Sequence, residues 1–272
     1  MFKEERFQEI VEELIAQDSV KVTDLANKFN VSISTIRTDL ADLEQKGLLR
    51  RTHGGAILAN KVTFQKPQLI EPTLGERSAI NMAEKAAIGK AAANLVSEGD
   101  TIMIDGGTTT PFVYRNLLNL NNLTIVSSSA ALISELSTLK KANIYILGGF
   151  LRRETASFVG EITEIAIGCI RANMAILGID GISLEEGLTT INFLEGGVKK
   201  QMIAASQKLI IVADYSKIGK VCLVPVAPIE KVSVIVTDEN APSHIIDAIK
   251  EKGIEAIIAK IKQPYNQNSS YR

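Results

Sequence analysis

The sequence predicts an α/β protein in two parts, a small helical part with one hairpin and a larger part built around a mostly parallel sheet. Near the N-terminus, apolar residues recur at helical spacing and lead into a basic segment that contains glycine. From about Glu76 onward, short apolar runs alternate with helical patterns, which is typical of buried parallel strands covered by helices. A length of 272 residues, 46% of them hydrophobic, is enough for two such domains.

The first 58 residues predict three helices followed by a two-stranded hairpin. Apolar residues such as Phe7 and Leu14 recur at helical spacing and define the first helix. Gly47 is expected to end the third helix, and Gly54 with Gly55 is expected to turn the hairpin. The expected elements, in order, are a helix at 3–16, an extended stretch at 20–22, a second helix capped by Thr23, a third helix capped by Ser32 or Ser34, and strands at 48–49 and 57–58.

A helix, a turn, a second helix and a basic hairpin, in this order, form a unit that can read duplex DNA. The first residues of the second helix of such a pair meet base edges, and the hairpin is placed to follow the groove. The guanidinium of Arg37 can donate two hydrogen bonds to the edge of one guanine. The residues that we expect to contact DNA are Thr23, Ser32, Ser34, Thr35, Arg37, Arg50, Arg51 and His53. The alternative is a small helical domain that binds protein, with Arg37 and Arg50 as solvated surface charges.

The overall charge does not by itself indicate a nucleic-acid partner, because the formal net charge of the chain is −1. Acids also outnumber cations within residues 1–60. The distribution is more informative, since most of these acids lie before residue 20, whereas residues 45–70 carry five cations and no acid. A local positive face can therefore hold phosphates while the opposite side of the domain stays acidic.

Two hydroxyl-rich loops in the larger part follow predicted buried strands. Residues 105–110 combine an aspartate, two glycines and three threonines, and residues 127–129 are three serines. Both loops are expected at the carboxyl edge of one sheet, where open α/β folds bind ligands. Hydroxyls and backbone N–H groups at such an edge suit a phosphorylated polyol. The alternative for the first loop is an ordinary strand-to-helix turn with Thr110 as the cap.

Further polar residues downstream extend the expected ligand site. Arg152 or Lys217 could neutralise a phosphate, and Asp105 or Asp180 could bind sugar hydroxyls, although Arg152 alone also fits a solvated surface role. The residues expected to bind the ligand are Asp105, Gly106, Gly107, Thr108, Thr109, Thr110, Ser127, Ser128, Ser129, Gly149, Arg152, Ser157, Gly160, Asp180, Gly181 and Lys217.

Together these motifs resemble the DeoR/GlpR family of bacterial transcriptional regulators over nearly the whole chain. The N-terminal motifs are VSxxTIRxDL from Val31 and RTHGGA from Arg51. Thr38 stands where the family typically has a second basic residue, so one potential phosphate contact is missing. The larger part is similar to the effector domain of the family, and in turn to ribose-5-phosphate isomerase, at residues 105–109, 157–160, 178–181 and 214–217.

The resemblance implies a domain order that agrees with the pattern of the residues. We expect a winged helix-turn-helix domain at 1–58, a linker at 59–75, a Rossmann-like, mostly parallel α/β sensor domain at 76–262, and a disordered tail at 263–272. The resemblance also implies a DNA-binding transcriptional regulator, a repressor of a sugar-catabolic operon that a phosphorylated sugar relieves. Because one helix reads only a few base pairs, we expect a homodimer or homotetramer on double-stranded operator DNA.

The alternative function is a sugar-phosphate isomerase-like enzyme with an accessory helix-turn-helix. Isomerisation needs a base that moves a proton between adjacent carbons. Where the isomerase carries its acidic base, the most natural alignment places Lys200, with Glu195 about one turn upstream as a possible substitute. A lysine is poorly suited to this proton transfer at neutral pH unless its pKa falls greatly. We therefore expect no catalytic residue and no enzyme activity.

Composition argues against several other classes of protein. No apolar run approaches the roughly 20 residues that cross a bilayer, and the N-terminus lacks the pattern of a secretory signal, so a cytoplasmic protein with no membrane partner is expected. Cys169 and Cys222 lie in apolar sequence and are expected to be buried thiols. The two histidines have no metal-ligand spacing with them, so we expect no metal site and no cofactor besides the sugar-phosphate effector.

Overall fold

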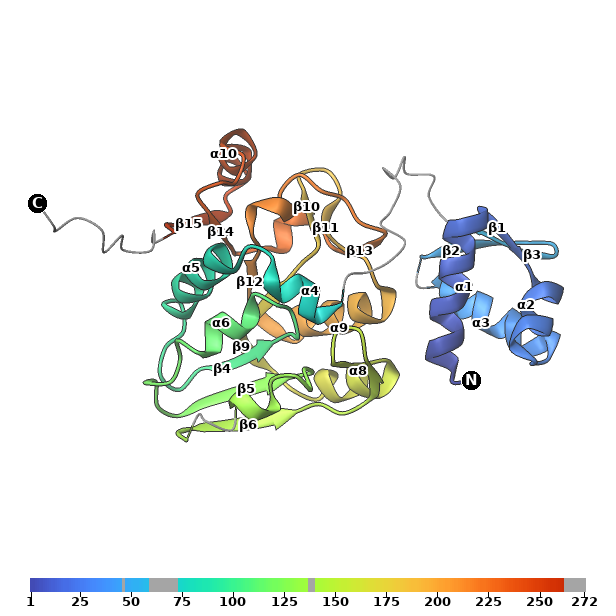
Figure 1. Ribbon diagram of the computed structural model, residues 1–272, viewed down its shortest axis with the longest axis horizontal. Helices are drawn as coiled ribbons and strands as arrows, with labels where there is room; N and C mark the ends of the chain where they lie inside the picture. The colour runs from blue at the N-terminus through green and yellow to red at the C-terminus, as the bar shows by residue number, and fades with distance from the viewer. Residues whose placement is uncertain (46, 59–72, 137–139, 262–272) are drawn as a thin grey trace, which may run out of the picture.

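The computed structural model describes residues 1–45, 47–58, 73–136 and 140–261. Figure 1 shows two bodies: the helices and hairpin of residues 1–58, which we call the reading module, and the α/β part from residue 73, which we call the sensor. The predicted linker at 59–75 is described only at 73–75, where the first sensor helix already begins. The predicted disordered tail at 263–272 lies outside the described residues.

The reading module contains the three helices and the hairpin that the sequence predicted. Its elements are α1 (Lys3–Gln17), β1 (Ser19–Lys21), α2 (Val22–Phe29), α3 (Ile33–Gln45), β2 (Leu49–Thr52) and β3 (Gly55–Leu58). The three strands pair antiparallel in the order β1-β3-β2. Ile10, Leu25, Ile36 and Leu43 are completely excluded from solvent between the helices. The apolar stripe of each helix is therefore what assembles the module.

The prediction that Thr23 caps the second helix is wrong. Strand β1 pairs with β3 and leads directly into α2 at Val22, so Thr23 lies inside the first turn, where its hydroxyl donates to Asp24 at 3.1 Å. Ser32 is the cap of α3, because its Oγ accepts from the amide of Thr35 at 3.1 Å.

A buried ion pair joins α1 to α3 inside the reading module. The guanidinium of Arg6 donates from Nε to Asp39 Oδ2 at 2.8 Å and from Nη2 to Asp39 Oδ1 at 3.2 Å. The Asp39 side chain is only 3% exposed, so the pair is shielded from water. An isolated buried charge is costly, so separating the two side chains would be unfavourable. The paired hydrogen bonds between guanidinium and carboxylate therefore fix how the two helices cross.

The sensor is built on one seven-stranded sheet, and all its strands are parallel. The strand order is β15-β14-β12-β9-β4-β5-β6. The strands are β4 (Thr101–Ile104), β5 (Leu123–Ser127), β6 (Ala142–Ile146), β9 (Ala172–Gly178), β12 (Ser206–Val212), β14 (Val234–Asp238) and β15 (Glu255–Ala259). The apolar runs predicted all of these except the edge strand β15, whose half-exposed residues break the pattern of a buried run.

Helices cover both faces of this sheet, which confirms the predicted α/β layering. Alternate residues of the inner strands enter two separate apolar clusters, one with α5 and α6 and the other with α8, α9 and α10. The helices are α4 (Leu74–Ala79), α5 (Met82–Ala93), α6 (Thr110–Tyr114), α7 (Ile133–Leu136), α8 (Glu161–Gly168), α9 (Phe193–Ala204) and α10 (Ser243–Glu251). Smaller sheets are formed by β7 (Phe150–Arg152) with β8 (Ser157–Val159), and by β10 (Gly181–Ser183), β11 (Gly187–Thr190) and β13 (Val224–Ala227).

The cysteines differ from their predicted environment. Cys169 is exposed and Cys222 is half-buried, because Cys169 lies at the C-terminal end of α8 rather than inside a strand. Partial burial, together with the charge of Asp180, raises the pKa of the Cys222 thiol to about 11. Among the described residues, no helix is long and apolar enough to span a membrane.

Candidate functional site

The reading module has a groove between α2, α3 and the hairpin. Its volume is about 520 Å³. Of the residues predicted to contact DNA, Thr23, Arg37, Arg51 and His53 line this groove. Ser32, Ser34 and Arg50 are exposed and Thr35 is half-buried on the same two elements. The fold therefore gathers the start of the reading helix and the basic hairpin around one concave surface, as docking into a major groove requires.

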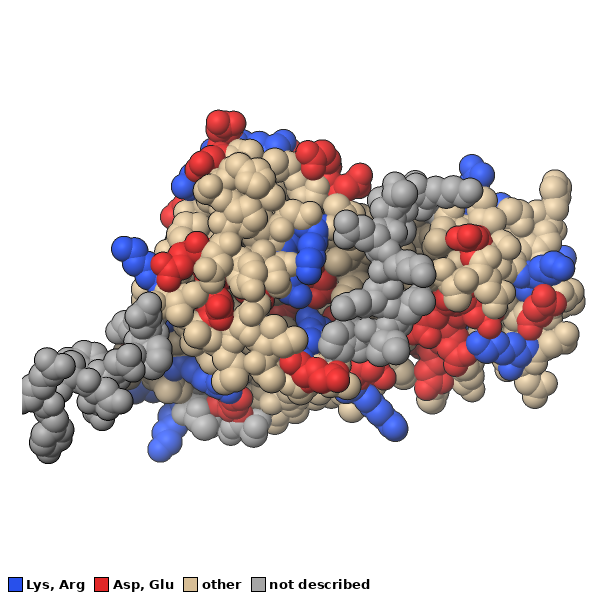
Figure 2. All heavy atoms as spheres, turned by 45° about the horizontal axis from the view of Figure 1, so that its top comes forward, with Lys and Arg blue, Asp and Glu red and all other residues tan. Residues whose placement is uncertain are grey.

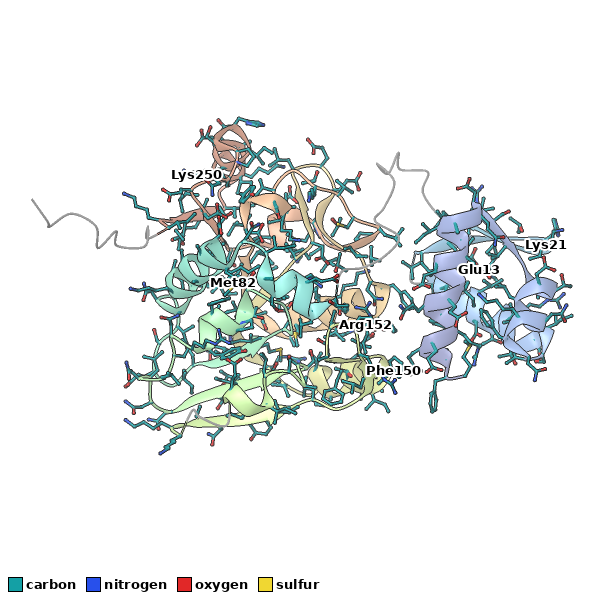
Figure 3. All side chains as sticks on the ribbon, in the orientation of Figure 1. Glu13, Lys21, Met82, Phe150, Arg152 and Lys250 are labelled. Carbon is teal, nitrogen blue, oxygen red and sulfur yellow. The ribbon has the colours of Figure 1, made fainter. Side chains whose placement is uncertain are left out.

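The charges on the reading module are divided between two sides. Lys28 pairs with Glu9 and Glu13 of α1, whereas Arg37 and Arg50 form no ion pair with any residue of the described part. Figure 2 shows acidic side chains on the part of the module beside the grey atoms, next to the sensor. Lys21, at the start of α2, lies on the side that points away from the sensor (Figure 3). None of the α1 residues, which the structure describes throughout, lines the groove.

Arg51 is partly engaged within the protein. Its Nε donates to Glu44 Oε2 at 2.6 Å, and its backbone amide donates to the other oxygen of the same carboxylate at 2.8 Å. The two side chains are 49% and 33% exposed, so the pair is solvated and weak. The sequence reasoning missed this partner, which holds the hairpin against α3 and reduces the positive charge available at position 51.

A pocket of about 230 Å³ opens at the carboxyl ends of β4, β9 and β12 in the sensor. The residues predicted to bind the ligand that line it are Asp105, Gly106, Gly107, Thr108, Thr109, Ser128, Ser157, Asp180 and Lys217. Gly106 is required by close packing, since a Cβ at that position would lie 2.2 Å from the hydroxyl of Ser157. The two polar loops and the later motifs therefore converge on one cavity.

Asp105 and Lys199 form a buried ion pair in the wall of this pocket. Lys199 Nζ donates to Asp105 Oδ2 and also to the carbonyl of Gly178 at 2.9 Å. The amides of Gly107 and Gly178 donate to the same carboxylate, Gly178 at 3.1 Å. Burial alone lowers the pKa of Lys199, but the charges of Asp105 and nearby carboxylates outweigh it and hold that pKa above its ordinary value. Lys199 is therefore held in its protonated, positively charged form.

Asp180 is a second carboxylate of the pocket lining and is held in its ionised form. It accepts from the Thr190 hydroxyl at 2.6 Å, from the Ile191 amide at 3.3 Å and from Arg77 Nη2 at 3.2 Å. Burial alone raises the pKa of Asp180, but Arg77, the Thr190 hydroxyl and the pocket lysines together hold it below its ordinary value. Because Arg77 belongs to α4, the first helix after residues 59–72 reaches into the pocket.

Glu195, in the first turn of α9, also accepts hydrogen bonds from within the protein. Its Oε1 accepts from Arg152 Nη1 at 2.9 Å and from the Thr155 hydroxyl at 2.6 Å. Figure 3 shows Arg152 beside α9. Arg152, predicted as a phosphate ligand or a surface residue, is instead only 3% exposed and supports Glu195 from behind the pocket lining.

Several polar side chains that line the pocket have no hydrogen-bond partner among the described residues. The side-chain amines of Lys217 and Lys220 form no hydrogen bond or ion pair with the residues that the structure describes. The hydroxyls of Thr108, Thr109 and Ser128 likewise have no partner within the described ranges. Figure 2 shows Lys and Arg side chains gathered in the middle of the sensor. Since buried polar groups are normally hydrogen-bonded, these donors are available to a ligand.

Seven of the residues predicted to bind the ligand do not line the pocket. Thr110 is fully buried and donates to the carbonyls of Asp105 and Gly107, so it shapes the loop. The Ser127 hydroxyl accepts from the Ser129 amide at 3.2 Å. The others behind or outside the lining are Ser129, Gly149, Arg152, Gly160 and Gly181. Thr110, Ser127 and Arg152 therefore act through hydrogen bonds behind the lining and not through direct exposure to the cavity.

Sequence reasoning missed several charged residues of the lining. The lysine that reaches the pocket is Lys199, whereas Lys200, aligned with the acid of the isomerase, is exposed on α9. The helical spacing of Glu195 and Lys199, which places them on one face, was the available signal. Arg77 and Lys85 had no such signal. Burial, opposed by Asp214, lowers the pKa of Lys85, whose Nζ donates to the carbonyl of Arg77.

Comparisons with known proteins match both bodies. A family model described as the DeoR-like helix-turn-helix domain matches residues 6–62, and one described as the DeoR C-terminal sensor domain matches residues 80–239. The transcriptional repressor AccR of Agrobacterium fabrum is 37% identical over 92% of this chain and 94% of its own. The HTH-type transcriptional regulator GlpR of Haloferax volcanii is 32% identical over 94% of this chain and 98% of its own.

A solved structure of a ribose 5-phosphate isomerase from Plasmodium falciparum also aligns with the chain. The identity is 19% over 51% of this chain and 53% of that one, with a TM-score of 0.37. A likeness of this size carries no argument about activity.

Proposed function

The chain belongs to the DeoR family of transcription regulators, and from this premise we propose that a phosphorylated sugar in the sensor pocket releases the reading module from operator DNA. The observation that carries the proposal is the convergence of free hydroxyls and the unpaired cations Lys217 and Lys220 on one cavity. A protein with this function works in the cytoplasm as a repressor of a sugar-related operon.

The DNA partner is supported by the groove of the reading module. The side chains of Arg37 on α3 and Arg50 on β2 are exposed and have no partner among the described residues, and Arg37 lines the groove that α2, α3 and the hairpin form. We propose that Arg37 reads a base edge and that Arg50 holds a phosphate. One such module contacts few base pairs, so the protein acts as a homodimer or homotetramer on two half-sites.

The ligand class follows from the chemistry of the lining. A phosphate group is matched by Lys217, Lys220 and the hydroxyls of Thr108 and Thr109, whereas sugar hydroxyls are matched by Ser128 and the carboxylate of Asp180. The nine pocket side chains that carry charge are five cations, Arg77, Lys85, Lys199, Lys217 and Lys220, and four anions, Asp105, Asp180, Glu195 and Asp214. The excess of one cation favours an anionic ligand, and no additional cofactor is needed.

We propose that the pocket binds the sugar phosphate without converting it. Asp105, Asp180 and Glu195 of the lining already accept hydrogen bonds from cations. Their donors are Lys199, Arg77 and Arg152 respectively. A carboxylate held in this way is a poor base for moving a proton between carbons. Nothing in the lining favours the isomerase alternative over binding alone.

The experiment that tests the proposal has two arms. The first selects DNA sites from a random pool with the full chain and measures their dissociation constants. The second adds ribose 5-phosphate, fructose 1-phosphate, fructose 6-phosphate or glycerol 3-phosphate and measures both thermal stabilisation and release of the selected DNA, because a ligand bound by the folded state raises its stability. We expect one of these compounds to stabilise the protein and to release the DNA. Turnover of ribose 5-phosphate at enzyme-like rates would contradict the absence of catalysis.

A further inference from the structure

One aromatic contact joins the reading module to the sensor. Phe7 of α1 packs on Phe193 of α9, with ring centroids 6.1 Å apart and planes inclined by 42°. Both side chains are buried, being 3% and 6% exposed. Buried apolar residues of the two bodies therefore form one continuous cluster, and Figure 1 shows α1 as the helix of the module that lies next to α9.

A second contact lies close to the first. Glu4, one turn before Phe7 on α1, packs over Gly160, where an added Cβ would lie 3.2 Å from Glu4 Cγ. Gly160 has a φ of +90°, a conformation that favours glycine, and immediately precedes α8. Helix α8 packs along α9. The reading module therefore rests on the α8–α9 pair of the sensor.

The same helix α9 contributes two charged side chains to the pocket. Glu195 and Lys199 are one helical turn apart, and each is tied to a different part of the lining, Glu195 to Arg152 and Thr155, and Lys199 to Asp105. Phe193 is only two residues from Glu195 and lies in the same first turn. A displacement of that turn is therefore transferred directly to the ring that holds Phe7.

We propose that α9 transmits occupancy of the pocket to the reading module through the contact between Phe193 and Phe7. The inference rests on the proposed function, in which the pocket binds a phosphorylated sugar. The phosphate and hydroxyls of that ligand compete with Asp105 for Lys199, and with Arg152 and Thr155 for Glu195. The contacts that hold α9 are weakened, the helix shifts, and the two rings separate. The empty pocket thus favours the arrangement in which the rings touch, and the ligand shifts the population away from it.

This route does not pass through the chain segment that connects the two domains. The predicted linker at 59–75, which joins the two domains along the chain, lies almost wholly outside the described residues. The contact between α1 and α9 is carried instead by two buried rings that have a defined partner in each body. Such a contact has two distinct states, because two packed aromatic rings either touch or are separated by water.

The chain contains no tryptophan, so a single introduced tryptophan reports on this contact. In the full-length Phe7→Trp variant, we expect a saturating phosphorylated sugar from the panel above to shift the emission to longer wavelength and to increase quenching by acrylamide several-fold. The matched control is Phe29→Trp, which places the reporter on α2 in the module core, away from the sensor, and should not respond. Calorimetry on the same samples shows independently whether the compound binds.

A second arm needs no ligand. Adding Glu195→Gln to Phe7→Trp weakens the hold of Arg152 on α9 and should shift the emission in the same direction, whereas Glu186→Gln, at an exposed position, should not. If Phe7→Trp does not fold, hydrogen exchange of the wild-type chain replaces it. There we expect the ligand to increase exchange in α1 and α9 but not in α2.

The outcomes separate the two proposals. Binding by calorimetry with unchanged emission from the Phe7→Trp variant, or with unchanged exchange in α1, overturns the route through Phe193 and leaves the proposed ligand intact. Absence of binding by every phosphorylated sugar of the panel counts against the proposed function, and the inference then fails with it. Binding with a response confined to Phe7→Trp supports both.

Discussion

Lys199 and Asp105, 94 residues apart in the sequence, form a buried ion pair in the sensor pocket. The pair joins α9 to the loop after β4, and therefore ties the helix that touches the reading module to the loop that carries the free threonine hydroxyls. A carboxylate neutralised in this way orients its neighbours and is not available as a base. The pair is thus a structural element of the sensor pocket.

Replacing Lys199 with methionine should destabilise the sensor. The change leaves Asp105 buried without its cation, and breaking one partner of a buried pair costs about 3–5 kcal/mol. The measurement is the free energy of unfolding by urea. The double variant Lys199→Met with Asp105→Asn should recover much of this loss, because no lone charge remains. Lys200→Met, on the exposed side of the same helix, is the control, and a loss of equal size there would refute the role of the pair.

Replacing Asp39 with asparagine should destabilise the reading module and leave the sensor pocket unchanged. Arg6 would keep its charge in a site that is closed to water, at a cost again of about 3–5 kcal/mol. Circular dichroism with calorimetric ligand binding separates the two effects. Asp42→Asn, whose pair with Lys3 is solvated, should cost at most about 1 kcal/mol. Equal effects of the two substitutions would show that burial of the Arg6 pair does not matter.

Replacing Arg37 with alanine should weaken DNA binding at one base position. Loss of a bidentate base contact costs about 1–3 kcal/mol and relaxes discrimination at that position. Arg50→Ala is the contrasting variant, since loss of a phosphate contact should weaken all sites alike and reduce the slope of log affinity against log salt by about 1. Gel-shift titrations on single-base variants of the selected site give both quantities. Unchanged discrimination between bases in Arg37→Ala would show that Arg37 does not read a base.

Replacing Lys217 with alanine should weaken binding of the phosphorylated sugar at least tenfold in calorimetry. Lys231→Ala, an exposed lysine outside the pocket, should have no effect. Affinity of the wild type should also fall several-fold between pH 7.5 and pH 5.5. The second pKa of a phosphate monoester is about 6, so the ligand loses one negative charge as the pH falls through that value. Affinity that is independent of both Lys217 and pH would argue against a phosphate contact here.

Local patterns were enough to place most elements of this chain. Helical periodicity defined α1 and α3, and short apolar runs located β4, β5 and β9, because burial on one face or on both leaves a direct trace in residue order. The edge strand β15 was missed, since two of its five residues are exposed and only one is buried, so its pattern is not that of a buried strand. The first residue of α2 was misplaced for a related reason, as the pairing of β1 overrides the preference of Thr23 for a cap.

By itself, the sequence determined the order of the two domains, the reading helix with its basic hairpin, and the polar loops at 105–110 and 127–129. These features depend on residues that are neighbours along the chain, so composition and spacing reveal them. Only the tertiary structure decided that Lys199 rather than Lys200 reaches the pocket, that Arg77 of α4 holds Asp180, and that Phe193 meets Phe7. Each of these depends on the rotation of a helix against a distant partner, which packing and desolvation select from many orientations that the local sequence allows equally.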